Sequence, residues 1–161
     1  MLFFFGEKMT ALTLANYILT RAKKQGINIT NLKLQKILYY VQGYFLAKFD
    51  HPLFPDDIQA WTFGPVVPNV YYHFSIFGPD NLFITREENI DTCALTTAER
   101  ELIDNVIDAK LQCSSSALVR ATHKEDPWLK ATLGGTRIQR NTIIDIEDIK
   151  HFFKTVRNCD E

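Results

Sequence analysis

Residues 32–47 read LKLQKILYYVQGYFLA, and residues 60–74 read AWTFGPVVPNVYYHF. The first stretch is typical of an aromatic-rich amphipathic helix. The second is typical of an extended segment, stiffened by prolines, that leads into another helix. Thirteen of the 20 aromatic residues of the chain lie between Tyr39 and Phe83. This clustering predicts that the packing centre, and with it the working surface, lies in the first half of the chain.

The first of these helices carries one apolar stripe. Thr30 can cap its N-terminus, because a threonine hydroxyl accepts a hydrogen bond from a free backbone N–H of the first turn. The stripe follows i, i+3, i+4, i+7 spacing and consists of Leu34, Ile37, Leu38, Val41 and Phe45. Lys33 and Lys36 lie off the stripe, and Tyr40 follows Lys36 by one turn. We therefore expect Lys36 and Tyr40 to face solvent.

The second stretch predicts a strand, a turn and a helix. Apolar residues alternate with small or polar ones over residues 58–63, as in a strand. Gly64-Pro65 is then expected to form a turn, and Pro68 suits the first turn of a helix that ends at residue 78. A second short strand is expected within residues 137–144 and can pair with the first. Because the Gly64–Pro68 run is rigid, it loses little entropy on binding, so it is a candidate contact edge.

Capping residues and apolar spacing predict the other helices. Helices are expected after Thr10, Thr96, Ser114 and Asp145, with one further turn over residues 128–131. The sequence contains no internal repeat and no low-complexity linker. We therefore expect a mainly α fold: a single domain of six or seven helices with a minor short β-strand pair.

Composition narrows the class of protein. The chain has 161 residues, of which 46% are hydrophobic and 23% charged, with a net charge of -1. This is the composition of a soluble globular domain, and it lacks the basic footprint of a nucleic-acid binder. No apolar run approaches the length needed to cross a membrane. The three cysteines, at positions 93, 113 and 159, form no CxxC pair, so reduced thiols in a cytoplasmic protein are expected.

The N-terminal residues 1–8 precede the patterned sequence. They are apolar, but they lack the basic region and the small-residue cleavage site of a signal peptide. The helical pattern begins right after Met9, so Met9 is an alternative to Met1 as the native start.

Residues for catalysis or metal binding are not grouped in the sequence. The four histidines (His51, His73, His123 and His151) have no i+3 or i+4 partner histidine, and Gly134-Gly135 is not followed by a phosphate-loop pattern. We therefore expect no enzymatic activity, no cofactor and no metal. One enzymatic alternative stays open, a hydrolase that uses His123 with Glu125 or Asp126, and it requires a cleft that joins these side chains to a nucleophile.

Four segments, in order along about a hundred residues, carry a family resemblance. They are Asn31–Tyr40 (NLKLQKILYY), Pro52–Phe54, Ala60–Pro68 (AWTFGPVVP) with Val70-Tyr71, and Thr122-His123 with Asp126-Pro127-Trp128. Together they resemble the Panacea domain of SocA-like antitoxins, also labelled phage-associated protein GepA. The resemblance assigns residues 9–158 to this domain and leaves residues 1–8 as an N-terminal extension.

The resemblance implies an antitoxin. Members of the family neutralise a cognate protein toxin by direct contact, and the namesake delivers its toxin to the ClpXP protease. Combined with the reasoning above, the predicted partner-binding residues are Lys33, Lys36, Tyr40, Gly64, Pro65, Val66, Pro68 and His123. The alternative function is a DNA-binding transcriptional regulator of a phage or mobile element, which the low net charge makes less favourable.

Overall fold

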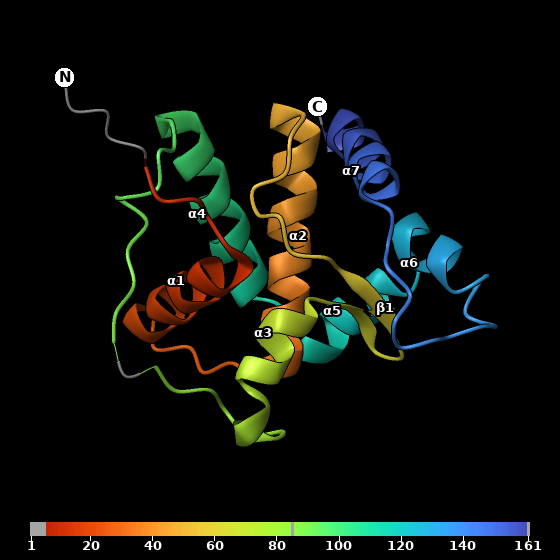
Figure 1. Cartoon of the computed structure of the whole chain (residues 1–161), viewed down its shortest axis with the longest axis horizontal. Coiled ribbons are helices and arrows are strands. Elements are labelled where there is room, and N and C mark those ends of the chain that lie inside the picture. Colours follow the sequence, from red (N-terminus) through yellow and green to blue (C-terminus); the bar gives the residue numbers. More distant parts are fainter. Residues whose placement is uncertain (1–5, 85, 161) are drawn as a thin grey trace.

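The chain folds around one central helix, α2 (Asn31–Phe49). The computed structural model describes residues 6–84 and 86–160, and side chains as far as residue 157. In Figure 1, α4 and α1 lie on one side of α2, and α7 and α6 lie on the other. The remaining elements are α1 (Ala11–Lys24), β1 (Gln59–Trp61), β2 (Gly64–Val66), α3 (Pro68–His73), the 3₁₀-helix η1 (Ser75–Phe77), α4 (Thr97–Leu111), α5 (Ser115–Thr122), α6 (Asp126–Ala131) and α7 (Ile146–Asp160).

This architecture confirms the predicted fold class. Over the described residues there are seven α-helices and one two-stranded antiparallel sheet. The same part of the chain contains no helix whose length and hydropathy suffice to span a membrane.

The helices begin at the predicted capping residues. The hydroxyls of Thr10, Thr30 and Ser114 each accept a hydrogen bond from the backbone N–H three residues later. Thr96 forms a full capping box with Glu99, in which each side chain binds the backbone N–H of the other residue. These bonds satisfy N–H groups that have no partner within the helix, so they fix where the helices start.

Helix α2 is buried on nearly every side. It packs against α1, α3, α4, α5, α7 and β2, so the residues off the predicted stripe are covered as well. The expectation that Lys36 and Tyr40 face solvent is wrong, because their relative exposures are 0% and 3%. The polar side chains that α2 buries, such as Lys36 and Gln35, are paired with backbone groups of neighbouring segments.

The last helix, α7, closes over α2 at a glycine. The ring of Phe153 from α7 lies against Gly43, where an added Cβ would overlap the ring. The same ring makes edge contacts with Tyr39, Tyr40 and Tyr44, with centroid distances of 5.4, 5.9 and 4.9 Å. A side chain at position 43 would therefore separate the two helices.

The predicted strand finds a different partner. Strand β1 pairs with β2, in the register Gln59↔Val66 and Trp61↔Gly64, so the Gly64-Pro65 dipeptide lies in a strand and not in the turn. Residues 137–144 contribute only an isolated bridge, between Ile143 and Gln59. Gly64 has a φ of +109°, which a residue with a side chain rarely adopts. This conformation lets the chain reverse after only two residues.

The start of the described chain is tied to the fold. Met9 is buried in the core, and Glu7 forms a parallel bridge with Cys93. The N–H of Glu7 donates to the carbonyl of Thr92, and the Thr92 hydroxyl donates to the Glu7 carboxylate. The described end of the N-terminal extension therefore packs against the 80–95 loop.

Candidate partner-binding site

The β1–β2 hairpin and the start of α3 are fixed to α2 by amide side chains. The carbonyl oxygen of Gln35 accepts a bond of 2.9 Å from the Val67 N–H, and its amide donates to Asn31. Asn31 in turn donates to the backbone carbonyl of Tyr71 at 3.0 Å. Because Gln35 and Asn31 are buried, their bonds to the backbone are shielded from water and hold the segment at residues 67–71 in one position.

Lys36 supports the hairpin from the side of α2. Its ammonium nitrogen donates to the carbonyl of Pro65 at 2.8 Å, and burial lowers the pKa of Lys36 to about 7. Its side chain and Thr122 lie so close to Gly64 that a Cβ there would be 2.8 Å from Lys36 Cε and 2.6 Å from Thr122 Oγ1. The hairpin can therefore pack this closely against α2 only because residue 64 has no side chain.

The tip of the hairpin is held from the opposite side by α5 and α6. His123 Nε2 donates to the Thr62 carbonyl at 2.9 Å, and the Trp128 indole N–H donates to the Trp61 carbonyl at 2.9 Å. The two donor rings also contact each other, with centroids 4.3 Å apart. His123 and Trp128 thus act as a clamp on residues 61–62.

Glu125 anchors the loop between α5 and α6. Its carboxylate accepts bonds from the hydroxyls of Tyr39 at 3.1 Å and Tyr40 at 2.8 Å. Burial raises the pKa of Glu125, while the two hydroxyls oppose this shift. The Lys110 ammonium lies 4.1 Å from the centroid of the Tyr40 ring. Of the residues of the hydrolase alternative, His123 binds the Thr62 carbonyl, Glu125 binds the two tyrosines and Asp126 lies in the first turn of α6.

Changing Tyr40 to phenylalanine is expected to destabilise the fold by about 1.5–3 kcal/mol, because a half-buried carboxylate loses one of its two tyrosine donors. Thermal unfolding at pH 7 measures the change. The matched control is Tyr72→Phe, because Tyr72 is 57% exposed and should lose less than about 0.5 kcal/mol. Equal melting temperatures of the two variants would contradict the structural role of the Tyr40 hydroxyl.

The outward face of the hairpin forms an apolar groove of about 680 Å³. The groove lies between the hairpin, the N-terminal turn of α2, the end of η1 and the 132–144 loop, and it is lined by Leu32, Gln35, Trp61, Thr62, Phe63, Val66, Tyr71, Gly78, Pro79, Ile138 and Arg140. Phe63 at the hairpin turn is 62% exposed. The groove therefore presents aromatic surface to solvent. The hydrogen bonds from α2, α5 and α6 hold the backbone of this surface in place.

The indole of Trp61 forms the centre of this surface. Gln59 fixes its orientation by accepting a bond of 2.9 Å from the indole N–H. The Tyr71 ring contacts the indole edge-on at 4.8 Å, and Tyr72 lies 6.0 Å away. The guanidinium of Arg140 lies 4.1 Å from the centroid of the indole. These contacts keep the ring cluster in place without any partner.

The predicted partner-binding residues fall into two groups. Six of them support the fold by burial or by a backbone bond: Lys33, Lys36, Tyr40, Gly64, Pro65 and His123. Lys33, for example, donates to the carbonyl of Leu111 at the end of α4 at 2.7 Å. Val66 lines the groove although it is largely buried, and Pro68 is half-buried at the start of α3.

Of the eleven groove residues only Val66 was among the predicted site residues, and the ten that were missed include Leu32, Phe63, Ile138 and Arg140. The sequence contained a signal for Phe63, because a large aromatic in a two-residue turn has no neighbours to cover it. Ile138 and Arg140 lie in the 132–144 loop, about seventy residues after the hairpin. No local sequence pattern could predict that they lie beside it.

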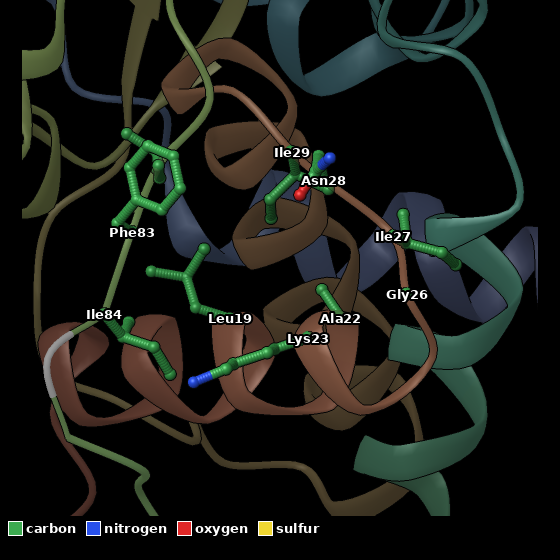
Figure 2. A pocket seen from close by; sticks show the side chains of 10 residues that line it. Leu19, Ala22, Lys23, Gly26, Ile27, Asn28, Ile29, Phe83 and Ile84 are labelled. Atoms are coloured by element: carbon green, nitrogen blue, oxygen red, sulfur yellow. The ribbon is translucent and has the colours of Figure 1, made fainter.

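A second, smaller hollow of about 280 Å³ lies between α1 and residues 82–84. In Figure 2, Leu19 from α1 points toward the segment that carries Phe83 and Ile84, and residues 26–29 border the opposite side. Phe83 is 69% exposed, so this hollow also presents one open aromatic ring. Its two walls are joined by the Leu82 N–H, which donates to the Ile29 carbonyl at 2.9 Å.

Comparison with known proteins identifies the family. The family model described as antitoxin SocA-like, Panacea domain, matches residues 34–129. Antitoxin SocA of Caulobacter vibrioides (strain NA1000 / CB15N) is 34% identical over 131 residues, which cover 76% of this chain and 70% of the relative. No solved structure gave a significant match. The matched residues include the central helix from Leu34 onward, the hairpin, and His123 and Trp128 of the clamp. The chain therefore belongs to the family of SocA-like antitoxins with a Panacea domain.

Proposed function

We propose that this chain is an antitoxin that neutralises a cognate protein toxin by binding it directly at the groove above the β1–β2 hairpin. The observation that carries this proposal is the ring cluster that lines the groove, with Phe63 62% exposed at its edge, on a backbone clamped by Gln35, Lys36, His123 and Trp128. Family membership supports the antitoxin role. We further propose that the chain acts as a binding module without catalysis of its own.

Two physical properties favour the groove as the contact surface. Aromatic and arginine side chains contribute most of the binding energy in protein interfaces, and the groove brings Trp61, Phe63, Tyr71 and Arg140 together. A backbone held in place before binding loses little entropy when a partner docks, so more of the contact energy remains as affinity.

Changing Phe63 to alanine tests the proposal against a matched control. We expect at least a tenfold loss of affinity for the toxin, since an exposed aromatic at the centre of an interface typically contributes about 1.4 kcal/mol or more. The control is Phe83→Ala, which removes an equally exposed phenylalanine from the other hollow. Both variants should keep the wild-type melting temperature.

The measurement is co-expression with the toxic product of the neighbouring gene, followed by titration of the two purified proteins. Growth should be restored by the wild-type chain and by Phe83→Ala, and restored poorly by Phe63→Ala. The reverse order would move the contact surface to the hollow at α1. If the wild-type chain neither binds the toxic protein nor relieves its toxicity, the proposed function is wrong.

We also propose, on family membership alone, that bound toxin is delivered to the ClpXP protease. In cells the toxin level should then fall when the chain is present and recover when the protease is deleted. A toxin level that is the same with and without the protease would leave inhibition by binding as the whole mechanism.

A further inference from the structure

Among the described residues that line the groove, Arg140 is the only charged one. It comes from the 132–144 loop, which contains two arginines and no acidic residue. Its guanidinium lies 4.1 Å from the centroid of Trp61 and 5.9 Å from those of Tyr71 and Tyr72. One positive charge therefore stands at the edge of an otherwise uncharged aromatic surface.

The contacts of Arg140 leave its hydrogen-bonding groups available. Contact with the face of an aromatic ring consumes none of the five N–H donors of a guanidinium. The described residues form no ion pair and no side-chain hydrogen bond with Arg140, and Asp80, which follows Pro79 at the rim, forms no ion pair with it. The fork of donors matches the two oxygens of a carboxylate.

We propose that the groove binds a segment of the toxin in which an apolar side chain is accompanied by a carboxylate, and that Arg140 pairs with this carboxylate. This proposal rests on the proposed function of the preceding section. The apolar side chain covers Phe63 and Ile138, and the carboxylate meets the N–H edge of the stacked guanidinium. Charge complementarity thus selects an acidic, apolar segment over a basic one.

A basic segment of a partner would compete with Arg140 for the aromatic rings. The rings of Trp61, Tyr71 and Tyr72 surround a cation, so a lysine or arginine of a partner could occupy their surface only after Arg140 had left. Removal of Arg140 would then improve binding. The two kinds of partner therefore predict opposite effects of one substitution.

The experiment measures the affinity of the purified cognate toxin for wild-type chain, Arg140→Ala and Arg140→Glu at low and at physiological salt. We expect about a 30-fold or greater loss for Arg140→Glu, a smaller loss for Arg140→Ala, and a weaker salt dependence in both variants. Changing the paired acidic residue of the toxin to lysine should restore binding to Arg140→Glu but not to the wild-type chain. The matched control is Arg137→Glu, which makes the same charge change in the same loop at a residue that does not line the groove.

The outcomes separate this inference from the proposed function. If the wild-type chain binds the toxin and Arg140→Glu binds it equally well, the carboxylate pairing is wrong while direct neutralisation stands. Tighter binding by Arg140→Ala would identify a basic segment as the occupant and also overturn the inference. Absence of binding by the wild-type chain overturns the proposed function itself. Unchanged melting temperatures in the Arg140 variants ensure that a loss of affinity reports on the surface.

Discussion

Lys36→Met should make the protein more stable than wild type at pH 6 and less stable at pH 10. Lys36 is fully buried, and burial lowers its pKa from the ordinary 10.5 to about 7. Below pH 7 the folded protein must hold a charged ammonium in an apolar environment. Methionine fills a similar volume without that charge.

The direction of the pH dependence follows from proton binding. Between pH 7 and 10.5 the unfolded chain keeps the Lys36 proton while the folded chain releases it, so the free energy of unfolding of the wild type rises with pH. Each unit of difference in pKa corresponds to about 1.36 kcal/mol, so the gain over this window is about 3–5 kcal/mol. At pH 10 the variant lacks the bond to the Pro65 carbonyl, which costs about 1–3 kcal/mol.

Denaturant unfolding of both proteins at several pH values checks this expectation. The difference between the two curves isolates Lys36, because the other titrating groups are common to both proteins. Lys24→Met serves as the control, since Lys24 is exposed at the end of α1 and its replacement should leave the curve parallel to wild type. A wild-type curve parallel to that of Lys36→Met between pH 7 and 10 would rule out a depressed pKa at Lys36.

Gly64→Ala should destabilise the fold by about 2–6 kcal/mol and abolish neutralisation. The new Cβ meets the Thr122 hydroxyl and the Lys36 side chain at less than 3 Å, which requires repacking worth about 1–3 kcal/mol. The φ of +109° adds about 1–3 kcal/mol of backbone strain. Because Gly64 begins β2, any shift there moves the floor of the groove.

The control for this substitution separates strain from crowding. Gly26 also has a positive φ, of +69°, but an added Cβ would meet nothing within 4 Å. Gly26→Ala should therefore lose only about 1–2 kcal/mol and keep full neutralisation. For a chain of this length, 1 kcal/mol corresponds to about 2–4 °C in melting temperature, so calorimetry resolves the two variants. Equal losses of stability in the two variants would show that contact of the new Cβ with Lys36 and Thr122 adds nothing to the destabilisation.

The sequence predicted the helices well because their signals are local. Thr10, Thr30, Thr96 and Ser114 lie next to the N–H groups that they cap, so neither tertiary structure nor distant residues are needed to place them. The burial of Lys36 and Tyr40 could not be obtained from one apolar stripe. A better signal was present, because residues 37–47 contain no charged residue, which is typical of a helix covered on all sides.

The groove was predicted only in part because its walls come from distant segments. The sequence singled out residues 60–68 as a candidate contact edge, but which of their side chains face outward depends on the register of β1 and β2. The sequence suggested Gly64 as part of a turn, whereas it lies in β2 opposite Trp61. Arg140 reaches Trp61 across almost eighty residues, and no local pattern connects the two.

The closure of α7 over Gly43 has a consequence for synthesis of the protein. Until residues 146–157 leave the ribosome, nothing in the emerging chain can cover the rings of Tyr39, Tyr40 and Tyr44 on the face that Phe153 later occupies. The N-terminal helices can form early, since domains begin to fold from their N-terminal part during translation. The central helix nevertheless acquires the cover of α7 only after the other described helices have been synthesised. A prematurely terminated copy would carry an open aromatic face prone to aggregation and proteolysis.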